Sequence, residues 1–205
     1  SVTNINNPDC EAIVTIHVSA LEGPNPSQTV PNLEFCDNTS IGIDTDGIIS
    51  FDLTLNEINI LNGQSANDFT VRYYTDAGLA NEITTPSNYQ NTNTTETIYV
   101  QVENNINTVC ATQTSFNIEV FALPVVTAVA TLSQCDDDVD GFSSFNLNEV
   151  NNEITTNAIN ETITFYESHT EAENSTNTIT NTSAYTNEVV SSDTVWARVE
   201  NTNGC

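Results

Sequence analysis

The residues best suited to chemistry form an acidic run between a cysteine and a glycine. Four aspartates fall within five positions, at Asp136, Asp137, Asp138 and Asp140. Carboxylates this close repel one another unless a cation neutralises them, and calcium takes about six to eight hard oxygen ligands in a flexible geometry. Asp-x-Asp-Gly resembles the start of an EF-hand loop, although the later positions of that motif are absent. The run therefore predicts a calcium-binding loop between strands, with a solvated acidic turn as the alternative.

A looser copy of this run lies earlier in the chain. Asp37 follows a cysteine directly, and Asp44 and Asp46 precede a glycine. The insertion 41–43 (Ile-Gly-Ile) separates Asp37 from Asp44 and has no counterpart in the later run. We expect calcium at this loop as well, but not at a site identical to the first.

The two acidic runs belong to an internal repeat. Tyr73-Tyr74 is matched by Phe165-Tyr166, the segment 97–104 is matched by 194–201, and Cys110 is matched by Cys205. Repeats of this length are typical of tandem modules that contact mainly their neighbours. We predict a first module at 28–123 and a second module at 124–205.

The elements that carry these residues are predicted to be strands. Short runs of Val, Ile, Phe and Tyr alternate with polar residues and are separated by Gly, Pro and Asn. Strands are expected at 30–35, 48–53, 69–74, 97–102 and 115–121 in the first module, and at 125–132, 144–147, 162–166 and 194–199 in the second. Residues 55–61 predict one or two helical turns. The fold class is therefore all-β, with two tandem Ig-like β-sandwich modules.

Residues 1–22 repeat the end of a module, so they predict the terminal strand of a preceding module. Its apolar positions are Ile13, Val14, Ile16 and Val18. The second module, in contrast, lacks its last strand. Two explanations remain open: the chain is part of a longer tandem array, or this strand is a donor strand that completes the second module of the next chain in a head-to-tail filament.

Five cysteines without a CxxC pair favour disulfides in an oxidising compartment. The preferred pairing closes each module on itself, joining Cys36 to Cys110 and Cys135 to Cys205 and leaving Cys10 to a preceding module. The alternative joins Cys10 to Cys36 and Cys110 to Cys135. Free buried thiols are the third possibility.

Charge excludes several classes of partner. The chain has 28 acidic residues and two basic ones, Arg72 and Arg198, so its formal net charge is −26. Such a chain cannot neutralise phosphates, which argues against nucleic acid and against an anionic membrane surface. No apolar run is long enough to insert into a membrane. We expect no nucleic-acid binding and no membrane insertion.

Catalysis has little support in the sequence. The two histidines, His17 and His169, are far apart and have no counterparts in the repeat. A nucleophile activated by histidine is therefore not indicated, and we predict no catalytic residues and no enzyme activity.

Several aromatic residues are candidates for a glycan-binding face, although packing in the core is their more common role. They are Tyr73, Tyr74, Tyr89, Tyr99, Tyr185 and Trp196.

The repeated motifs resemble a known class of surface protein. They include Leu-x-x-Cys-Asp (33–37 and 132–136), Asp-Gly-x-x-x-Phe-x-Leu (46–53 and 140–147) and Val-Glu-Asn (102–104 and 199–201). This pattern is similar to the tandem repeat modules of large adhesin and gliding-type proteins of flavobacteria and other Bacteroidetes, which are exported by the type 9 secretion route. The resemblance implies an extracellular location at the cell surface.

We therefore expect a structural repeat region of an adhesin or filament, stiffened by calcium and disulfides, whose partners are neighbouring modules or subunits. The alternatives are a glycan-binding module that contacts surface glycans, and an accessory domain of a secreted hydrolase.

Overall fold

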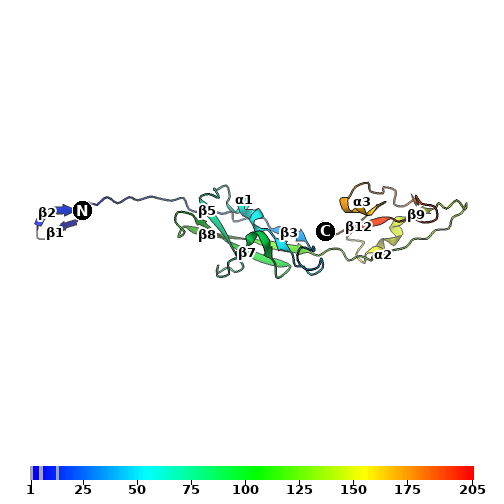
Figure 1. Cartoon of the computed structure of the whole chain (residues 1–205), viewed down its shortest axis with the longest axis horizontal. Helices are drawn as coiled ribbons and strands as arrows, with labels where there is room; N and C mark the ends of the chain where they lie inside the picture. The colour runs from blue at the N-terminus through cyan, green and yellow to red at the C-terminus, as the bar shows by residue number, and fades with distance from the viewer. Residues whose placement is uncertain (1, 5–6, 13) are drawn as a thin grey trace. The chain divides into compact units, whose positions relative to one another are not determined.

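The structure is a computed structural model that describes residues 2–4, 7–12 and 14–205, with side chains described from residue 14 (Figure 1). The chain divides into two compact units. One contains the chain up to Pro31 together with Leu55–Thr84 and Ile98–Ser115, and the other contains Asn32–Thr54, Thr85–Thr97 and Phe116–Cys205.

The first unit begins with a short hairpin. Strand β1 (Val2–Asn4) pairs antiparallel with β2 (Asn7–Ala12). A 3-10 turn, η1 (Leu53–Asn56), leads into the single-turn helix α1 (Glu57–Ile60), as the sequence predicts for this stretch. Strand β5 (Phe69–Tyr74) pairs antiparallel with β7 (Thr95–Asn104), so that Tyr74 lies opposite Tyr99.

The largest sheet has the strand order β3-β8-β7-β5. Strand β3 (Leu33–Cys36) runs parallel to β8 (Ala111–Phe121), which places Cys36 opposite Phe121. Alternate residues of β7 and β8 are buried, as expected for strands with one face on a core. The buried set on these two strands includes Ile98, Val100, Val102, Phe116, Ile118 and Val120.

A second, two-stranded sheet lies beside β3. Strand β4 (Ser50–Phe51) pairs with β6 (Tyr89–Gln90), which follows the 3-10 turn η2 (Pro86–Asn88). The ring of Phe51 is fully buried and meets Phe35 of β3 edge to face, with 5.6 Å between ring centroids. This aromatic pair joins the small sheet to the large one.

The second module repeats these elements in shorter form. Strand β9 (Ser144–Phe145) leads into η3 (Leu147–Val150) and α2 (Asn151–Ile154), and β10 (Thr162–Tyr166) is followed by α3 (His169–Asn174). Strand β11 (Tyr185–Thr186) pairs with β9, and β12 (Trp196–Glu200) pairs antiparallel with β10.

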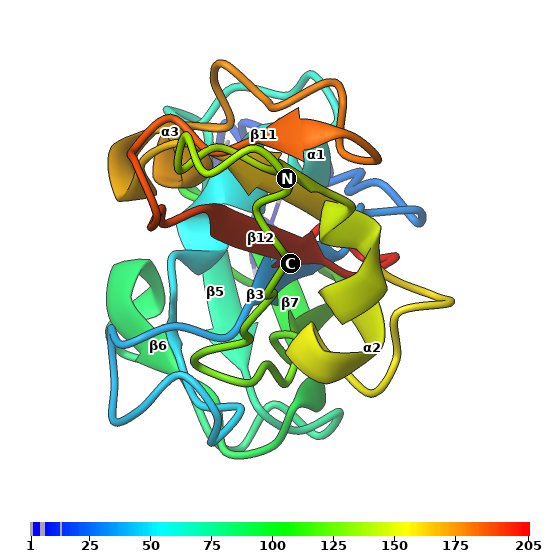
Figure 2. The same ribbon diagram turned by 90° about the vertical axis from the view of Figure 1, so that its right-hand side faces the viewer.

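The core of the second module lies between these short elements, with α3 on one side of β12 and α2 on the other (Figure 2). Its buried members are Leu147, Val150, Ile154, Phe165 and Tyr185.

The predicted fold class is confirmed: the chain is all-β, with short helices and two tandem modules. Two of the expected strands, 69–74 and 162–166, form with the predicted bounds. No helix in the described part of the chain has the length and the apolar character needed to cross a membrane.

One strand prediction is wrong, and a second stays a prediction. Residues 125–132 form only an isolated bridge, Val126 with Thr155, and no strand. Val14–Val18, within the predicted donor strand at 13–18, form no strand in the single chain, and Ile13 lies outside the described residues. A donor strand pairs only with its acceptor, so this prediction is neither confirmed nor contradicted. Both stretches have the alternation of a strand, but neither pairs with a neighbouring strand among the described residues, and unpaired backbone groups remain solvated.

Candidate cation-binding loops and the inter-module disulfide

The second acidic loop, 136–141, is organised by the carboxylate of Asp136. Its Oδ1 accepts a hydrogen bond from the backbone N–H of Val139 at 2.8 Å, and its Oδ2 accepts one from Gly141 at 2.7 Å. The carboxylate of Asp140 accepts from the N–H of Phe142 at 2.8 Å. The loop is therefore closed by side chains that accept backbone hydrogen bonds, as Asp and Asn commonly do in turns.

The first acidic loop, 37–47, is closed in the same way in spite of its insertion. Asp37 Oδ2 accepts from the N–H of Gly47 at 2.7 Å, and Asp46 Oδ1 accepts from the N–H of Ile48 at 2.9 Å. The first and last aspartates of both loops thus have the same local partners. The insertion is accommodated between them.

The two loops differ in how they place oxygen atoms. Carboxylate oxygens of Asp136, Asp138 and Asp140 all lie within 4.8 Å of one another on the exposed surface, and Asp137 is not part of this group. In the first loop Asp37 is buried. Asp37, Asp44 and Asp46 are not brought together in this way within residues 14–205.

Charge repulsion is visible within the second loop. The nearby charge of Asp140 raises the pKa of Asp138, whereas the hydrogen bond from the Gly141 N–H lowers the pKa of Asp136. Three exposed carboxylates that converge, with one disfavoured in its ionised form, are a suitable partial ligand set for a hard divalent cation that completes its shell with water.

The glycine that ends each loop is required by its conformation. Gly47 and Gly141 have φ values of 72° and 86°, in the left-handed region that side chains disfavour. A Cβ atom would also lie 2.6 Å from Thr94 Cγ2 at Gly47 and 2.5 Å from Val190 Cγ1 at Gly141. The Asp-Gly pair of each module is therefore structural as well as acidic.

A buried asparagine holds each loop from the opposite side. In the first module Asn91 Oδ1 accepts from the N–H of Ile49 at 2.7 Å, and its Nδ2 donates to the carbonyl of Gly47 at 2.8 Å. In the second module Asn187 makes the same bonds with Ser143 and Gly141, at 2.7 and 2.9 Å. Sequence reasoning missed these residues, although the spacing Tyr-x-Asn at 89–91 and 185–187 is shared by the two modules.

A tyrosine beside each asparagine contacts an acid. The hydroxyl of Tyr89 donates to Glu96, and the hydroxyl of Tyr185 lies 2.7 Å from Asp193 and 3.0 Å from Glu167. Burial, followed by these carboxylates, raises the pKa of both tyrosines. Both remain protonated and act as donors at neutral pH.

The two acids that contact Tyr185 respond differently to this environment. Burial raises the pKa of Glu167, and the neighbouring charges of Glu188 and Asp193 act in the same direction. For Asp193 burial also acts to raise the pKa, but hydrogen bonds from Tyr185 and from backbone N–H groups outweigh it, so the pKa is lowered.

A disulfide joins the two modules through Cys36 and Cys205, with Cα atoms 5.5 Å apart. Cys36 ends β3 opposite Phe121, and the next carbonyl, that of Ala122, accepts a hydrogen bond from Asn201 Nδ2 at 2.9 Å. Asn201 also accepts from the N–H of Cys205 at 3.1 Å. One asparagine thus links the turn that carries Cys205 to the backbone beside Cys36.

The predicted cysteine pairings are therefore wrong. Cys36 bonds to Cys205 and not to Cys110 or Cys10, and both Cys110 and Cys135 are free. The side chain of Cys10 lies outside the described residues. The prediction failed because repeat spacing identifies equivalent cysteines but does not say which equivalents meet in space.

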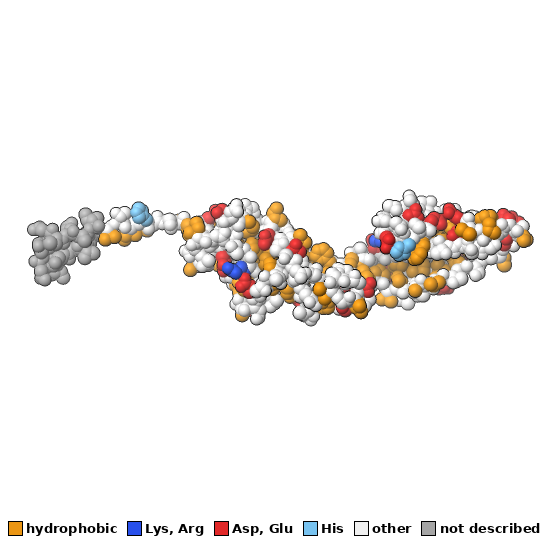
Figure 3. All heavy atoms as spheres, in the orientation of Figure 1, with side chains coloured by type: hydrophobic (Ala, Val, Ile, Leu, Met, Phe, Trp, Pro, Cys, Tyr) orange, Lys and Arg blue, Asp and Glu red, His pale blue; other side chains and the backbone are white. Residues whose placement is uncertain are grey.

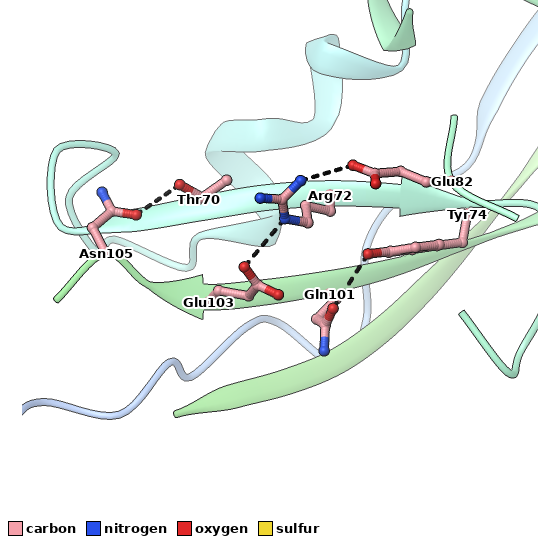
Figure 4. A network of polar contacts seen from close by, with 7 residues as sticks. All are labelled: Thr70, Arg72, Tyr74, Glu82, Gln101, Glu103 and Asn105. Carbon is pink, nitrogen blue, oxygen red and sulfur yellow. Dashed lines mark hydrogen bonds and ion pairs between the residues drawn. The ribbon is translucent and has the colours of Figure 1, made fainter. Parts of the chain in front are cut away.

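The two arginines occupy related places in the two modules. Arg72 on β5 lies opposite Gln101 of β7 and pairs with Glu82 at 2.8 Å and Glu103 at 3.1 Å (Figure 4). Arg198 on β12 lies opposite Thr164 of β10 and approaches Glu200 at 3.6 Å. Each module therefore has one cation at this cross-strand pair.

The candidate glycan-binding aromatics do not form one face. Tyr73, Tyr74 and Tyr185 are buried, whereas Trp196 is exposed. The indole of Trp196 meets His169 edge to face, with centroids 4.7 Å apart.

Comparison with known proteins identifies the modules. The model of one family, the Flavobacterium inter-domain disulphide bond domain, matches the chain twice, over residues 32–124 and 131–205. The chain belongs to this family. No curated protein and no solved structure matches it.

The bond between Cys36 and Cys205 is an inter-domain disulfide, as the family description says. It starts in the first inter-domain disulphide bond domain and ends in the second. The chain is accordingly a flavobacterial tandem repeat whose modules are covalently linked.

Proposed function

We propose that this tandem repeat is a structural, non-enzymatic region of a bacterial cell-surface adhesin or filament, exported by the type 9 route. The observation that carries the proposal is the Cys36–Cys205 bond between two domains of one family. A covalent link between successive modules resists their separation and serves a load-bearing array. Its function is to hold neighbouring modules together and to display what the array carries.

The same bond supports the proposed extracellular location, because disulfides persist in oxidising compartments. The charge of −26 fits this setting, since saline screens the repulsion between exposed carboxylates while the charge keeps the array soluble. Acidic side chains are spread over the visible surface (Figure 3). We expect a surface of this charge not to bind nucleic acid.

Surface labelling of the source cells tests the location. An antibody raised against residues 32–205 is expected to label intact cells. In protein taken from these cells, Cys36 and Cys205 are expected to react with a thiol-alkylating reagent, and so to gain mass, only after the disulfide is reduced. An antibody against a cytoplasmic protein controls for lysis. Labelling that appears only after permeabilisation would refute the proposal.

Calcium is the cofactor that we propose for the second loop. The support is the convergence of Asp136, Asp138 and Asp140 within 4.8 Å, together with the raised pKa of Asp138. A bound cation removes the repulsion between Asp138 and Asp140 and so stabilises the folded state. At calcium concentrations above Kd, the free energy of unfolding rises with the logarithm of the calcium concentration.

A pair of charge-neutralising variants tests this site. Calcium is expected to raise the Tm of the wild-type chain relative to sodium chloride of equal ionic strength, and EDTA is expected to reverse the rise. Asp138→Asn should abolish the rise, whereas Asp137→Asn, from the same loop but outside the converging group, should retain it. Scanning calorimetry measures all three proteins, and a wild-type Tm that calcium does not change would end the proposal.

A glycan-binding module is the second candidate function, favoured by the exposure of Trp196 beside His169. An exposed indole is the side chain that most often stacks on the apolar face of a sugar. Glycan-array binding that disappears in Trp196→Ala would support this function, and an array without signal would remove it.

A further inference from the structure

The extended segment after the first hairpin exposes an apolar face that has no partner. Val14, Ile16 and Val18 are 72%, 80% and 90% exposed, and hydrophobic side chains are visible along this segment in Figure 3. Residues 14–20 contain no acidic side chain, which is unusual in a chain of charge −26. This composition is typical of a strand that packs one face against a hydrophobic core.

The internal repeat shows which strand it corresponds to. Cys10 precedes this segment as Cys110 precedes β8, and Gly23-Pro24 follows it as Leu123-Pro124 follows β8. By this alignment Val14, Ile16 and Val18 correspond to Thr114, Phe116 and Ile118 of β8. Those three residues are at most 9% exposed, because β8 lies inside the four-stranded sheet.

Among the described residues, β12 has one open edge at the position that β8 occupies beside β7 in the first module. Strand β7 is flanked by β5 and β8, whereas its counterpart β12 pairs only with β10 among the described residues. Val100 and Val102 of β7 are fully buried, but their counterparts Ala197 and Val199 on β12 remain exposed or half-buried. The free edge of β12 and the unpartnered segment are therefore complementary halves of one sheet.

We propose that two copies of the chain join head to tail, with residues 14–20 of one copy adding as an antiparallel strand to β12 of the other. This inference rests on the proposed structural function, and it identifies the partner as a second copy of the same chain. Strand addition of this kind gains backbone hydrogen bonds and fills the exposed apolar positions of the acceptor module.

The register of the added strand follows from the first module. Thr97 of β7 and Asn117 of β8 are hydrogen-bonded at 2.9 Å and lie opposite each other. Their counterparts are Thr194 and His17, so Ile16 of one copy faces Val195 of the other.

The free cysteines support the same join independently. Within the chain, the first cysteine of one module, Cys36, bonds to the last cysteine of the next module, Cys205. Cys135 is the counterpart of Cys36, and Cys110 is the counterpart of Cys205; both are free. A second copy joined through residues 14–20 places its first module after the acceptor's second module, which brings its Cys110 to Cys135 of the acceptor.

The covalent step is a thiol–disulfide exchange with a low-molecular-weight disulfide such as oxidised glutathione. The Cys135 thiolate attacks oxidised glutathione, forms a mixed disulfide and releases one glutathione thiol. The Cys110 thiolate of the other copy then attacks the Cys135 sulfur and releases the second glutathione thiol. Two protein thiols are oxidised to one disulfide while one glutathione disulfide is reduced to two thiols.

A matched pair of charge substitutions tests the strand. Ile16→Asp introduces a carboxylate into the proposed interface, and Ile58→Asp introduces the same change at an exposed isoleucine of α1 with almost the same exposure, 79%. Sedimentation velocity of the 205-residue chain at rising concentration is expected to show multiples of 22.3 kDa for the wild type and for Ile58→Asp. Ile16→Asp is expected to remain monomeric over that range.

The proposal is overturned if the wild type is monomeric at every concentration, as it would be if the segment folds back on its own β12. It is also overturned if Ile16→Asp assembles as well as Ile58→Asp. Surface labelling of cells is unaffected by either result, so this failure is distinguishable from failure of the proposed function.

Isotope mixing tests the cysteines. A mixture of ¹⁵N-labelled and unlabelled chains, oxidised with glutathione disulfide and digested without reduction, is expected to yield Cys110–Cys135 peptides with one labelled and one unlabelled half. A complete lack of such mixed peptides, with every Cys110–Cys135 peptide labelled in both halves or in neither, would show a bond within one chain and refute the join, as would disulfide-linked dimers that persist in Cys135→Ser.

Discussion

Individual carboxylates are stabilised in this protein mainly by hydrogen bonds, because arginine is too scarce to pair with them. Asp37 and Asp136 accept from loop N–H groups, and Glu96 and Asp193 accept from tyrosine hydroxyls. Charge-assisted bonds of this kind are stronger than neutral ones. Burial acts to raise the pKa of Glu96 and Asp193, but these bonds outweigh it, so the pKa of both is lowered, as is that of Asp136. Glu167 is the exception, since its pKa is raised by burial and by neighbouring acids.

Replacement of Glu167 by threonine, the residue at the equivalent position of the first module (Thr75), is expected to stabilise the second module at neutral pH. A raised folded-state pKa means that the contribution of Glu167 to stability is greatest below its unfolded pKa and is lost as pH rises through the folded value. The gain from Glu167→Thr, about 1 kcal/mol or less for a half-buried carboxyl that solvent still screens, should therefore disappear below pH 4.5, the ordinary value.

Urea unfolding followed by Trp196 fluorescence reports on this module, because Trp196 is the single tryptophan and lies on β12. Glu153→Thr, which removes an exposed acid from α2, controls for the change in net charge. A gain of equal size in both variants, or a gain that persists at low pH, would contradict the assignment.

Much of the candidate site could be predicted from residue types, and its geometry could not. The aspartates were found because four carboxylates in five positions repel one another, which indicates a bound cation, and because the first loop is a looser copy of the second. Asn91 and Asn187 were missed because asparagine is abundant in this chain, so one buried asparagine does not differ in sequence from many exposed ones. Burial is a property of the fold, and it turns an ordinary residue into one that closes a loop.

Among the elements, each acidic loop and the short strand that follows it depend on one buried amide. Asn91 bridges the Gly47 carbonyl, the Ile49 N–H and the Asn93 carbonyl, and Asn187 makes the equivalent three bonds in the second module. Because β4 and β9 each have only two residues, these side-chain bonds provide order that a longer ladder would otherwise give.

Asn91→Ala is expected to lower the free energy of unfolding of the first module by about 3 kcal/mol, since it leaves a buried N–H and two carbonyls without partners. Hydrogen-exchange mass spectrometry should show loss of protection at residues 37–51. Asn93→Ala, a neighbouring exposed position, is the control and should change protection little. Equal exchange in the two variants would show that the loop does not depend on Asn91.

Strand prediction succeeded where a partner strand exists and failed where it does not. Residues 69–74 and 162–166 alternate in the sequence and find β7 and β12 beside them. Residues 125–132 have a similar apolar pattern but no neighbouring strand among the described residues, because pairing is decided by tertiary contacts that periodicity does not record. The cysteine pairing failed for the same physical reason.

For the whole molecule, the bond between Cys36 and Cys205 is the main covalent constraint, since it spans a sequence separation of 169 residues. Closing a loop of that length removes conformational freedom chiefly from the unfolded chain. The two modules are therefore stabilised together by one bond that belongs to neither alone.

Cys36→Ser is expected to lower the free energy of unfolding by up to about 5 kcal/mol, the chain-entropy value for a loop of this length. Cys110→Ser makes the same substitution at a cysteine that is free within the chain, and it should have little effect on the monomer. Urea unfolding of both monomeric variants measures the difference. Equal stability of the two would show that the bond does not constrain the unfolded chain.

The position of this bond also decides which atoms carry a pulling force. Tension applied outside residues 36–205 passes from Cys36 to Cys205 through two sulfur atoms, and the 169 intervening peptide steps are bypassed. At about 3.5 Å per residue, roughly 600 Å of contour length stays hidden while the bond holds. The domains cannot be stretched open one after another while the bond holds, and its reduction exposes both folded modules to the force, so that this length is gained only as they unfold.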